Sequence, residues 1–135
     1  MAVQLSVAVR NARLDAIETT IGTSAVLKIR TGAQPATCAT ADSGTVLATL
    51  SLPSDYLAAA SSGSKAKSGT WEDASADATG TAAHWRLYAS DGTTCHAQGT
   101  VTATGGGGDL TVDNTSFAAA QAFSITSWSF TDGNA

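Results

Sequence analysis

The spacing of apolar residues changes at Gly22, and this change constrains the fold more than any other feature of the chain. Before Gly22, apolar residues recur at spacings of seven, three and four, which is the period of an amphipathic helix. After Gly22, Ala25, Leu27 and Ile29 alternate with a second set of side chains that includes a lysine and an arginine. Alternation of this kind is the period of a strand. The sequence therefore predicts a helix followed by a β-rich region.

The predicted helix spans residues 6–22. Ser6 can cap its N-terminus, and Gly22 can adopt the left-handed conformation that ends a helix. Its apolar side chains form one narrow stripe, made by Val7, Leu14, Ile17 and Ile21. Such a stripe on a terminal helix packs against its own domain or against another subunit, and the sequence leaves both open. We assign residues 1–22 to an N-terminal helical arm and predict that the stripe is part of an intersubunit interface.

Residues 23–135 form the predicted β domain. After the strand at 25–30, strand-type runs follow at 45–52, 65–73, 81–90, 93–104, 109–113 and 121–131. The run at 45–52 is apolar on both faces, so we expect it in the centre of a sheet. Many short strands separated by turn residues are typical of a sandwich or a barrel. The predicted fold class is therefore mainly β: a β-sandwich or jelly-roll-like domain preceded by a short N-terminal α-helix.

The strongest turn signal lies between residues 81–90 and 93–104. Asp91-Gly92 is the dipeptide that a two-residue type I′ hairpin turn favours. In the first strand of this hairpin, we expect Trp85 and Leu87 to face the core. The other face carries His84, Arg86 and Tyr88, which we expect to point to solvent.

Charge and the distribution of apolar residues argue against nucleic-acid and membrane partners. The net charge is −4, and the seven Lys and Arg residues are scattered in ones and twos. Nucleic-acid binding needs a basic patch that neutralises phosphates, so we predict no nucleic-acid partner. No apolar run approaches the roughly 18 residues of a membrane span, and the N-terminus lacks a basic region before its apolar residues. We therefore expect no membrane partner and synthesis in the cytoplasm of the cell that makes the chain.

Few residues combine into a reactive or metal-binding set. His84 and His96 lie in facing strands, but the adjacent residues Cys95 and His96 point to opposite faces of one strand. An acidic segment, with Glu72, Asp73 and Asp77, lacks the register and closing glutamate of a calcium loop. We therefore predict no catalytic residues, no metal, no cofactor and no enzymatic activity.

The two cysteines, Cys38 and Cys95, are too few for a disulfide framework. We expect two reduced, half-buried thiols, with a bridge between two loops as the alternative. The aromatic residues allow a further alternative, because a row of exposed aromatic rings can bind sugars. This alternative would use Trp71, Trp85, Tyr88 and Trp128.

Much of the chain resembles a group of small structural proteins of tailed bacteriophages, encoded beside the major capsid gene. The stretches that carry the resemblance are NARLDAIETTIG, LKIRTG, DSGTVLATLSLPSDYL, GTWEDASADATGTAAHWRLY and TCHAQGTVTATGGGGDLTVDN. Such proteins resemble capsid decoration, or cement, proteins. The resemblance implies a virion protein on the outer capsid surface that bridges capsomers. Its implied partners are the major capsid protein and further copies of itself, and a place on the neck or tail stays open.

Overall fold

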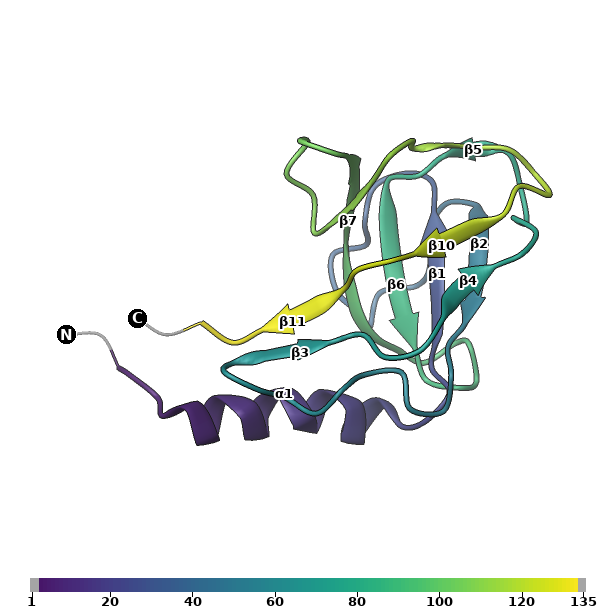
Figure 1. The fold of residues 1–135 in the computed structure, drawn as a ribbon. Coiled ribbons are helices and arrows are strands. Elements are labelled where there is room, and N and C mark those ends of the chain that lie inside the picture. Colours follow the sequence, from purple (N-terminus) through teal and green to yellow (C-terminus); the bar gives the residue numbers. More distant parts are fainter. Residues whose placement is uncertain (1–2, 134–135) are drawn as a thin grey trace.

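The computed structural model describes residues 3–133, which form one N-terminal helix followed by short strands (Figure 1). Helix α1 spans Val7–Ile21. The strands are β1 Val26–Arg30, β2 Val46–Ser51, β3 Ser64–Ala66, β4 Trp71–Asp73, β5 Gly80–Thr81, β6 His84–Tyr88, β7 Cys95–Ala103, β8 Leu110–Val112, β9 Ser116–Phe117, β10 Phe123–Ile125 and β11 Ser129–Thr131. Strands account for 36% and helix for 11%, which confirms the mainly β class with one preceding helix.

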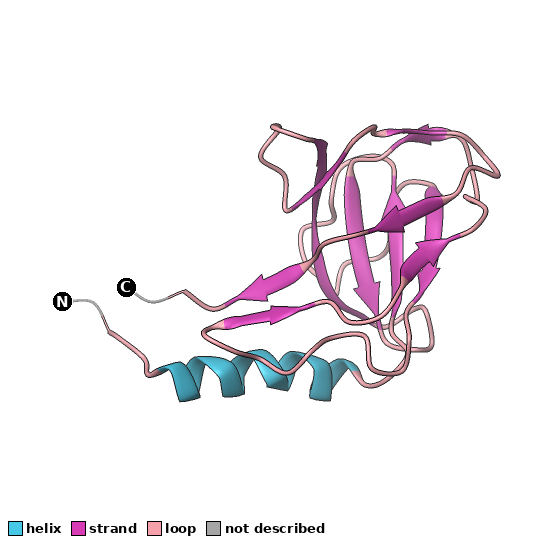
Figure 2. Cartoon of the chain, in the orientation of Figure 1, coloured by secondary structure: helices cyan, strands magenta, loops and turns pink. Residues whose placement is uncertain are grey.

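The main sheet has five strands in the order β2-β1-β6-β7-β8. Its pairs are antiparallel except for β7 and β8, which run parallel. The sheet curls, and short two-stranded pairs lie over its concave side (Figure 2): β10 with β4, and beyond it β11 with β3. Strands β5 and β9 form a third pair. The jelly-roll connectivity remains a prediction.

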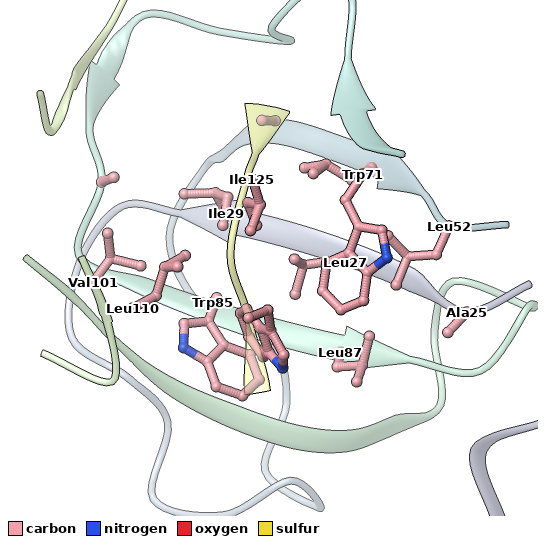
Figure 3. Packing of buried hydrophobic residues seen from close by; sticks show 14 of the residues in the cluster. Ala25, Leu27, Ile29, Leu52, Trp71, Trp85, Leu87, Val101, Leu110 and Ile125 are labelled. Atoms are coloured by element: carbon pink, nitrogen blue, oxygen red, sulfur yellow. The ribbon is translucent and has the colours of Figure 1, made fainter. Parts of the chain in front are cut away.

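The core lies between the curled sheet and the β10–β4 pair (Figure 3). Leu27, Ile29 and Leu87 point into it from the sheet, and Trp71 enters from the opposite side. Trp85 packs edge-on against Trp128, with ring centroids 4.7 Å apart. These contacts confirm that Trp85 and Leu87 face the core, as the alternation in this strand predicts.

Helix α1 packs against its own chain, alongside the β3–β11 pair (Figure 1). Ser6 caps it by accepting a hydrogen bond from the Val9 amide at 3.3 Å, and Gly22 ends it with a φ of 87°. On its inner face, Leu14 and Ile21 are buried, and Ile17 packs on the core.

A buried lysine on β3 pairs with two carboxylates on the same face of the helix and so holds the helix on the β domain. Lys65 Nζ on β3 lies 2.8 Å from Asp15 Oδ1 and 2.9 Å from Glu18 Oε2. Lys65 itself is buried, with 3% of its side chain exposed. Burial opposes its charged form, but the two carboxylates outweigh this and raise the pKa of Lys65 above its ordinary value. The helix thus packs on its own domain and buries Leu14 and Ile21 there, while the predicted contact with another subunit stays a prediction.

Strand β2 lies at an edge of the main sheet, so the prediction of a central position is wrong. Residues 73–77 cover its outer edge. The Asp77 amide donates to the Leu47 carbonyl at 2.7 Å, and the Thr49 amide donates to Asp73 Oδ2 at 2.9 Å. Asp77 Oδ2 accepts from the Thr49 hydroxyl at 2.7 Å. Exposed strand edges invite pairing with other chains, and these aspartates block that edge.

The turn between β6 and β7 differs from the predicted type I′ turn. The Gly92 amide donates to the Ala89 carbonyl at 3.0 Å, and only Gly92 in this turn has a positive φ, of 68°. A type I′ turn needs positive φ at both central residues. Asp91 instead accepts hydrogen bonds from the Thr93 and Thr94 amides, each at 2.8 Å, which stabilises a longer loop.

Candidate functional site

The face of β6 opposite the core is also buried. His84 and Tyr88 have no exposed surface and Arg86 has 1%, so the prediction that these three side chains point to solvent is wrong. The loop between β1 and β2, residues 31–45, covers them. The physical reason is that this loop supplies backbone and carboxylate oxygens to a polar face, which can be buried once its donors are satisfied.

Arg86 is the centre of this cover. Its Nη2 donates to the Cys38 carbonyl at 2.8 Å, and its Nη1 donates to the Thr40 carbonyl at 3.1 Å and to Asp42 Oδ1. Its Nε contacts Cys95 Sγ at 3.2 Å. Its Nη2 also donates to the Thr37 carbonyl at 3.3 Å. Each of the five guanidinium donors therefore has an acceptor, which is the condition for burying a charge.

Asp42 joins three side chains of this cluster. Besides Arg86, it accepts a hydrogen bond from Arg30 Nη2 at 2.9 Å and one from the Tyr88 hydroxyl at 2.7 Å. Partial burial raises the pKa of Asp42, but the Tyr88 hydrogen bond and the two arginines outweigh it and hold this pKa below its ordinary value. Burial and the Asp42 carboxylate raise the pKa of Tyr88 to about 12. The cluster therefore holds a carboxylate and a neutral phenol at neutral pH.

His84 occupies the end of the same face. Its Nδ1 lies 2.8 Å from the Gly32 carbonyl. Burial lowers the pKa of His84 below its ordinary value, with Arg30 and Arg86 acting in the same direction and the Gly32 carbonyl against it. A neutral imidazole that donates to Gly32 fits this arrangement.

The two thiols meet at the edge of the cluster. Cys38 and Cys95 are both half-buried and are not joined by a disulfide in this structure. Burial and a hydrogen bond with Cys38 raise the pKa of Cys95 to about 11. The thiolate is the reactive form of cysteine, so the Cys95 thiol is a poor nucleophile at neutral pH. The cluster as a whole is arranged to hold the 31–45 loop on the sheet.

The structure separates the other candidate ligands. His84 lies under the 31–45 loop, whereas His96 is exposed and lines a small hollow with Ile17 and Ile21 of α1. Asp73 and Asp77 bind the edge of β2, and Glu72 is exposed. Within residues 3–133, no three His, Cys, Asp or Glu side chains lie close enough to hold a metal ion.

A groove of about 1040 Å³ lies between β7–β8 and the C-terminal strands β10–β11. Its apolar lining includes Trp85, Phe123, Trp128 and Phe130. Its charged lining residues are Asp109 and Asp113, and no Lys, Arg or His lines it. Ligand sites typically measure about 300–1,000 Å³, so the groove has room for a substantial ligand.

Three buried polar atoms of groove-lining residues have no hydrogen-bond partner within the described chain. They are Trp85 Nε1, Trp128 Nε1 and Gln98 Oε1. Leaving such a group unpaired costs about 1–3 kcal/mol. Sequence patterns gave no sign of this groove, because its two walls come from segments that are not paired with each other.

The aromatic row expected for a sugar-binding face does not form. Trp71 is 1% exposed, Trp85 5% and Trp128 9%, so none presents an open ring face. Tyr88 lies on the opposite side of β6, under the 31–45 loop, where its hydroxyl bonds Asp42. Of the aromatic groove residues, Phe123 and Phe130 are the partly exposed ones.

The exposed large apolar side chains of residues 3–133 gather at one end of the chain. They are Val3, Val7 and Val9, which are 80%, 47% and 46% exposed. All three lie at or before the first turns of α1, at the end of the helix that projects from the β domain (Figure 1). Val7 is thus the exposed member of the predicted interface stripe, whereas Ile17 is partly buried.

Comparison with known proteins finds no matching family model, no similar curated protein and no similar solved structure. No helix in the described part of the chain is long and apolar enough to cross a membrane.

Proposed function

We propose that this chain is a structural protein of a tailed-bacteriophage virion, a capsid decoration protein that stabilises the head by bridging capsomers. Its partners are the major capsid protein and neighbouring copies of itself, and its place is the outer capsid surface. The resemblance of nearly the whole chain to small structural phage proteins supports this proposal.

The observation that carries the proposal is the position of Val3, Val7 and Val9. Exposed apolar residues that gather in one place mark contact surfaces more often than scattered ones do. Here all three lie at the projecting end of α1, away from the compact β domain, with Val7 and Val9 on different sides of the helix. A protein that binds only the assembled shell stabilises that shell by mass action, so a modest contact repeated over many copies is sufficient.

The test is binding of the purified chain to phage heads assembled without it, measured by co-sedimentation. Replacing Val7→Asp and Val9→Asp together should weaken binding at least about tenfold, a loss of about 1.4 kcal/mol per copy. Both positions are near the N-terminus of α1, where a carboxylate is favourable, so the variant should stay folded.

A matched control places the same charge elsewhere. Ala119→Asp adds an aspartate at an exposed position between β9 and β10, and it should bind heads as the unmodified chain does. Equal loss in both variants would indicate a nonspecific charge effect. Full binding by the Val7→Asp and Val9→Asp variant would remove the observation that carries the proposal.

A second candidate is carbohydrate binding by a fibre or neck component. The groove favours it, since partly exposed Phe123 and Phe130 with amide and hydroxyl side chains, and no cation, suit a neutral sugar. Imaging the virion separates the two candidates. A decoration protein occurs in many copies over the head, and a fibre or neck component occurs in few copies at one vertex.

A further inference from the structure

The two cysteines of the chain meet beside the Arg86 guanidinium. Arg86 Nη2 donates to the Cys38 carbonyl at 2.8 Å, and Arg86 Nε donates to Cys95 Sγ at 3.2 Å. One planar group therefore contacts both residues, and it holds the turn that carries Cys38 next to the start of β7. The chain has no other cysteine, so a disulfide within one copy can only join these two.

A β-bulge in β7 explains why Cys95 lies on this side of the sheet. The Leu87–Ala97 pair between β6 and β7 is followed directly by the Tyr88–Cys95 pair, so His96 is an extra residue in β7. Residues that pair across antiparallel strands share a face of the sheet. Cys95 therefore lies with Tyr88 on the polar face of β6, whereas Ala97 packs against the core.

A tight turn in the covering loop presents Cys38 to the same place. The Thr40 amide donates to the Thr37 carbonyl at 3.1 Å, which closes a four-residue turn with Cys38 at its second position. A hydrogen bond from Gln98 Nε2 to the Pro35 carbonyl, at 2.7 Å, holds the preceding part of the loop on β7. The position of Cys38 relative to β7 is thus fixed from two sides.

The two thiols are placed to react with each other and with a small oxidant. Both are half-buried, and Cys38 lines the groove beside β7. A disulfide requires side chains that face each other. The two thiols do so, because besides burial it is a hydrogen bond with Cys38 that raises the pKa of Cys95 to about 11. The Cys95 thiol is therefore protonated at neutral pH, which makes Cys38 the thiol that reacts first.

We propose that Cys38 and Cys95 form a disulfide in oxidising surroundings and that this bond fixes the 31–45 loop to β7. The oxidant is a low-molecular-weight disulfide such as oxidised glutathione. The Cys38 thiolate attacks one sulfur of that disulfide, so a mixed disulfide forms and one thiolate leaves. Cys95 then loses its proton and attacks the Cys38 sulfur, and the second thiolate leaves. Two protein thiols are oxidised to one disulfide, and the oxidant is reduced to two thiols, which take up the two protons.

The surrounding contacts are compatible with both redox states. Oxidation removes the Cys95 thiol hydrogen, which contacts the Ala97 carbonyl at 3.4 Å, and leaves the sulfur as the acceptor of Arg86 Nε. Free thiols and a bridge, which the sequence leaves open, are then two states of one site. Reducing compartments keep the thiols free, and oxidising media outside the cell let the bond persist. The site is separate from the proposed contact at the start of α1, so it does not depend on the proposed function.

The first test counts free thiols in the full-length chain after incubation of the folded protein with excess oxidised glutathione. The reaction is stopped with acid, the chain is unfolded, and its thiols and its mass are measured. The unmodified chain should lose both thiols, carry no glutathione and stay monomeric. Cys95→Ser should retain one glutathione on Cys38. Cys38→Ser should react at least about tenfold more slowly, because its remaining thiol is protonated.

The second test asks whether the bond fixes the loop. Oxidation should raise the midpoint of thermal unfolding of the unmodified chain by at least about 5 °C and should slow hydrogen exchange of residues 31–45. Neither change should occur in Cys38→Ser. The matched control combines Cys38→Ser with Ala39→Cys, which moves the thiol to the next, exposed position of the same turn. Its thiol points in another direction, so the disulfide should form at least about tenfold less readily.

Three results would overturn the inference. If both thiols stayed free in the folded chain under excess oxidant, the side chains would not meet as a disulfide requires. Bridges that form only between copies, or only after unfolding in urea, would exclude an internal site in the folded chain. A bond that left both the unfolding midpoint and the exchange of residues 31–45 unchanged would mean that it does not fix the loop.

Discussion

Strand β6 is buried on both faces, and the two faces are covered by different chemistry. On one face, Trp85 and Leu87 enter an apolar core. On the other, Arg86 and Tyr88 meet Asp42 of the 31–45 loop. Burying the apolar face lowers the free energy of the folded state because apolar surface is removed from water, and this effect has little directional requirement. Burying the polar face stabilises the fold only when each hydrogen-bond donor meets an acceptor in the right geometry.

The difference shows what each cover contributes. The apolar contacts provide the larger part of the folding free energy, since each large buried side chain contributes about 1.5–3 kcal/mol. The polar contacts hold the 31–45 loop in place, because Arg86 donates to the Cys38 and Thr40 carbonyls of that loop. We therefore expect substitutions on the apolar face to affect global stability most, and substitutions on the polar face to act first on the loop.

The largest expected effect is that of Trp85→Ala. Trp85 packs on Trp128 and lies against Gly99, where an added Cβ would come within 2.6 Å of the indole ring. Truncating a buried tryptophan costs about 3–5 kcal/mol, a large part of the roughly 5–15 kcal/mol that stabilises a domain. Urea unfolding should show a folded fraction that is much reduced or absent. A loss below about 1 kcal/mol would mean that the apolar face does not dominate.

A smaller effect is expected for Asp42→Ala on the polar face. Removing one partner of a buried ion pair costs about 3–5 kcal/mol, and water at the partly exposed Asp42 side chain lowers this toward about 2 kcal/mol. The reason for the loss is that Arg86, with 1% of its side chain exposed, would keep its charge without a carboxylate. The loop should open before the sheet does, so hydrogen exchange of residues 31–45 should rise more than that of β1 and β6.

The control for Asp42→Ala is Asp55→Ala, which removes an exposed carboxylate outside the 31–45 loop and should change unfolding by less than about 0.5 kcal/mol. If Asp42→Ala left both stability and loop exchange unchanged, the ion network would not hold the loop.

Local signals in the sequence predict part of this structure. The helix ends follow from Ser6 and Gly22, and the inward position of Trp85 follows from alternation along one strand. The burial of Arg86 could not be predicted, because most of its partners are backbone carbonyls of a loop, and carbonyls carry no residue signature. The edge position of β2 was hidden for a similar reason: Asp73, 24 positions from Thr49, covers that edge.

The groove was missed because it depends on what remains unpaired after the strands have assembled. Alternation identifies strands and their faces, but it does not identify their neighbours. The apolar stripe of the helix gave a mixed result for the same reason. It identified Leu14 and Ile21 as residues that need cover, and the cover is their own domain; the role of Val7 in a contact between subunits stays a prediction.

The smallest expected effect is the pH dependence that His84 gives to the polar face. The folded-state pKa of His84 lies below its ordinary value of 6.5, so between these two values the unfolded chain binds more protons than the folded chain. Stability is therefore complete above about 6.5 and falls as the pH drops through that value, until the folded pKa is reached. The pKa of Asp42 in the folded chain lies below 3.8, so the stability that its carboxylate contributes is lost only at pH values below 3.8. That loss therefore does not overlap with the loss caused by His84.

Unfolding free energies at about pH 7.5 and about pH 5 isolate the histidine contribution, because other side chains seldom titrate in this range. The charged groups that face His84 are Arg30, Arg86 and Asp42. His84→Asn can retain a hydrogen bond to the Gly32 carbonyl without titrating, so its stability should change less between the two pH values than that of the unmodified chain. The control is His96→Asn at the exposed histidine, which should keep the full pH dependence. If His96→Asn removed the dependence and His84→Asn kept it, the titrating group would lie beside α1, and the buried polar face of β6 would be insensitive to mild acid.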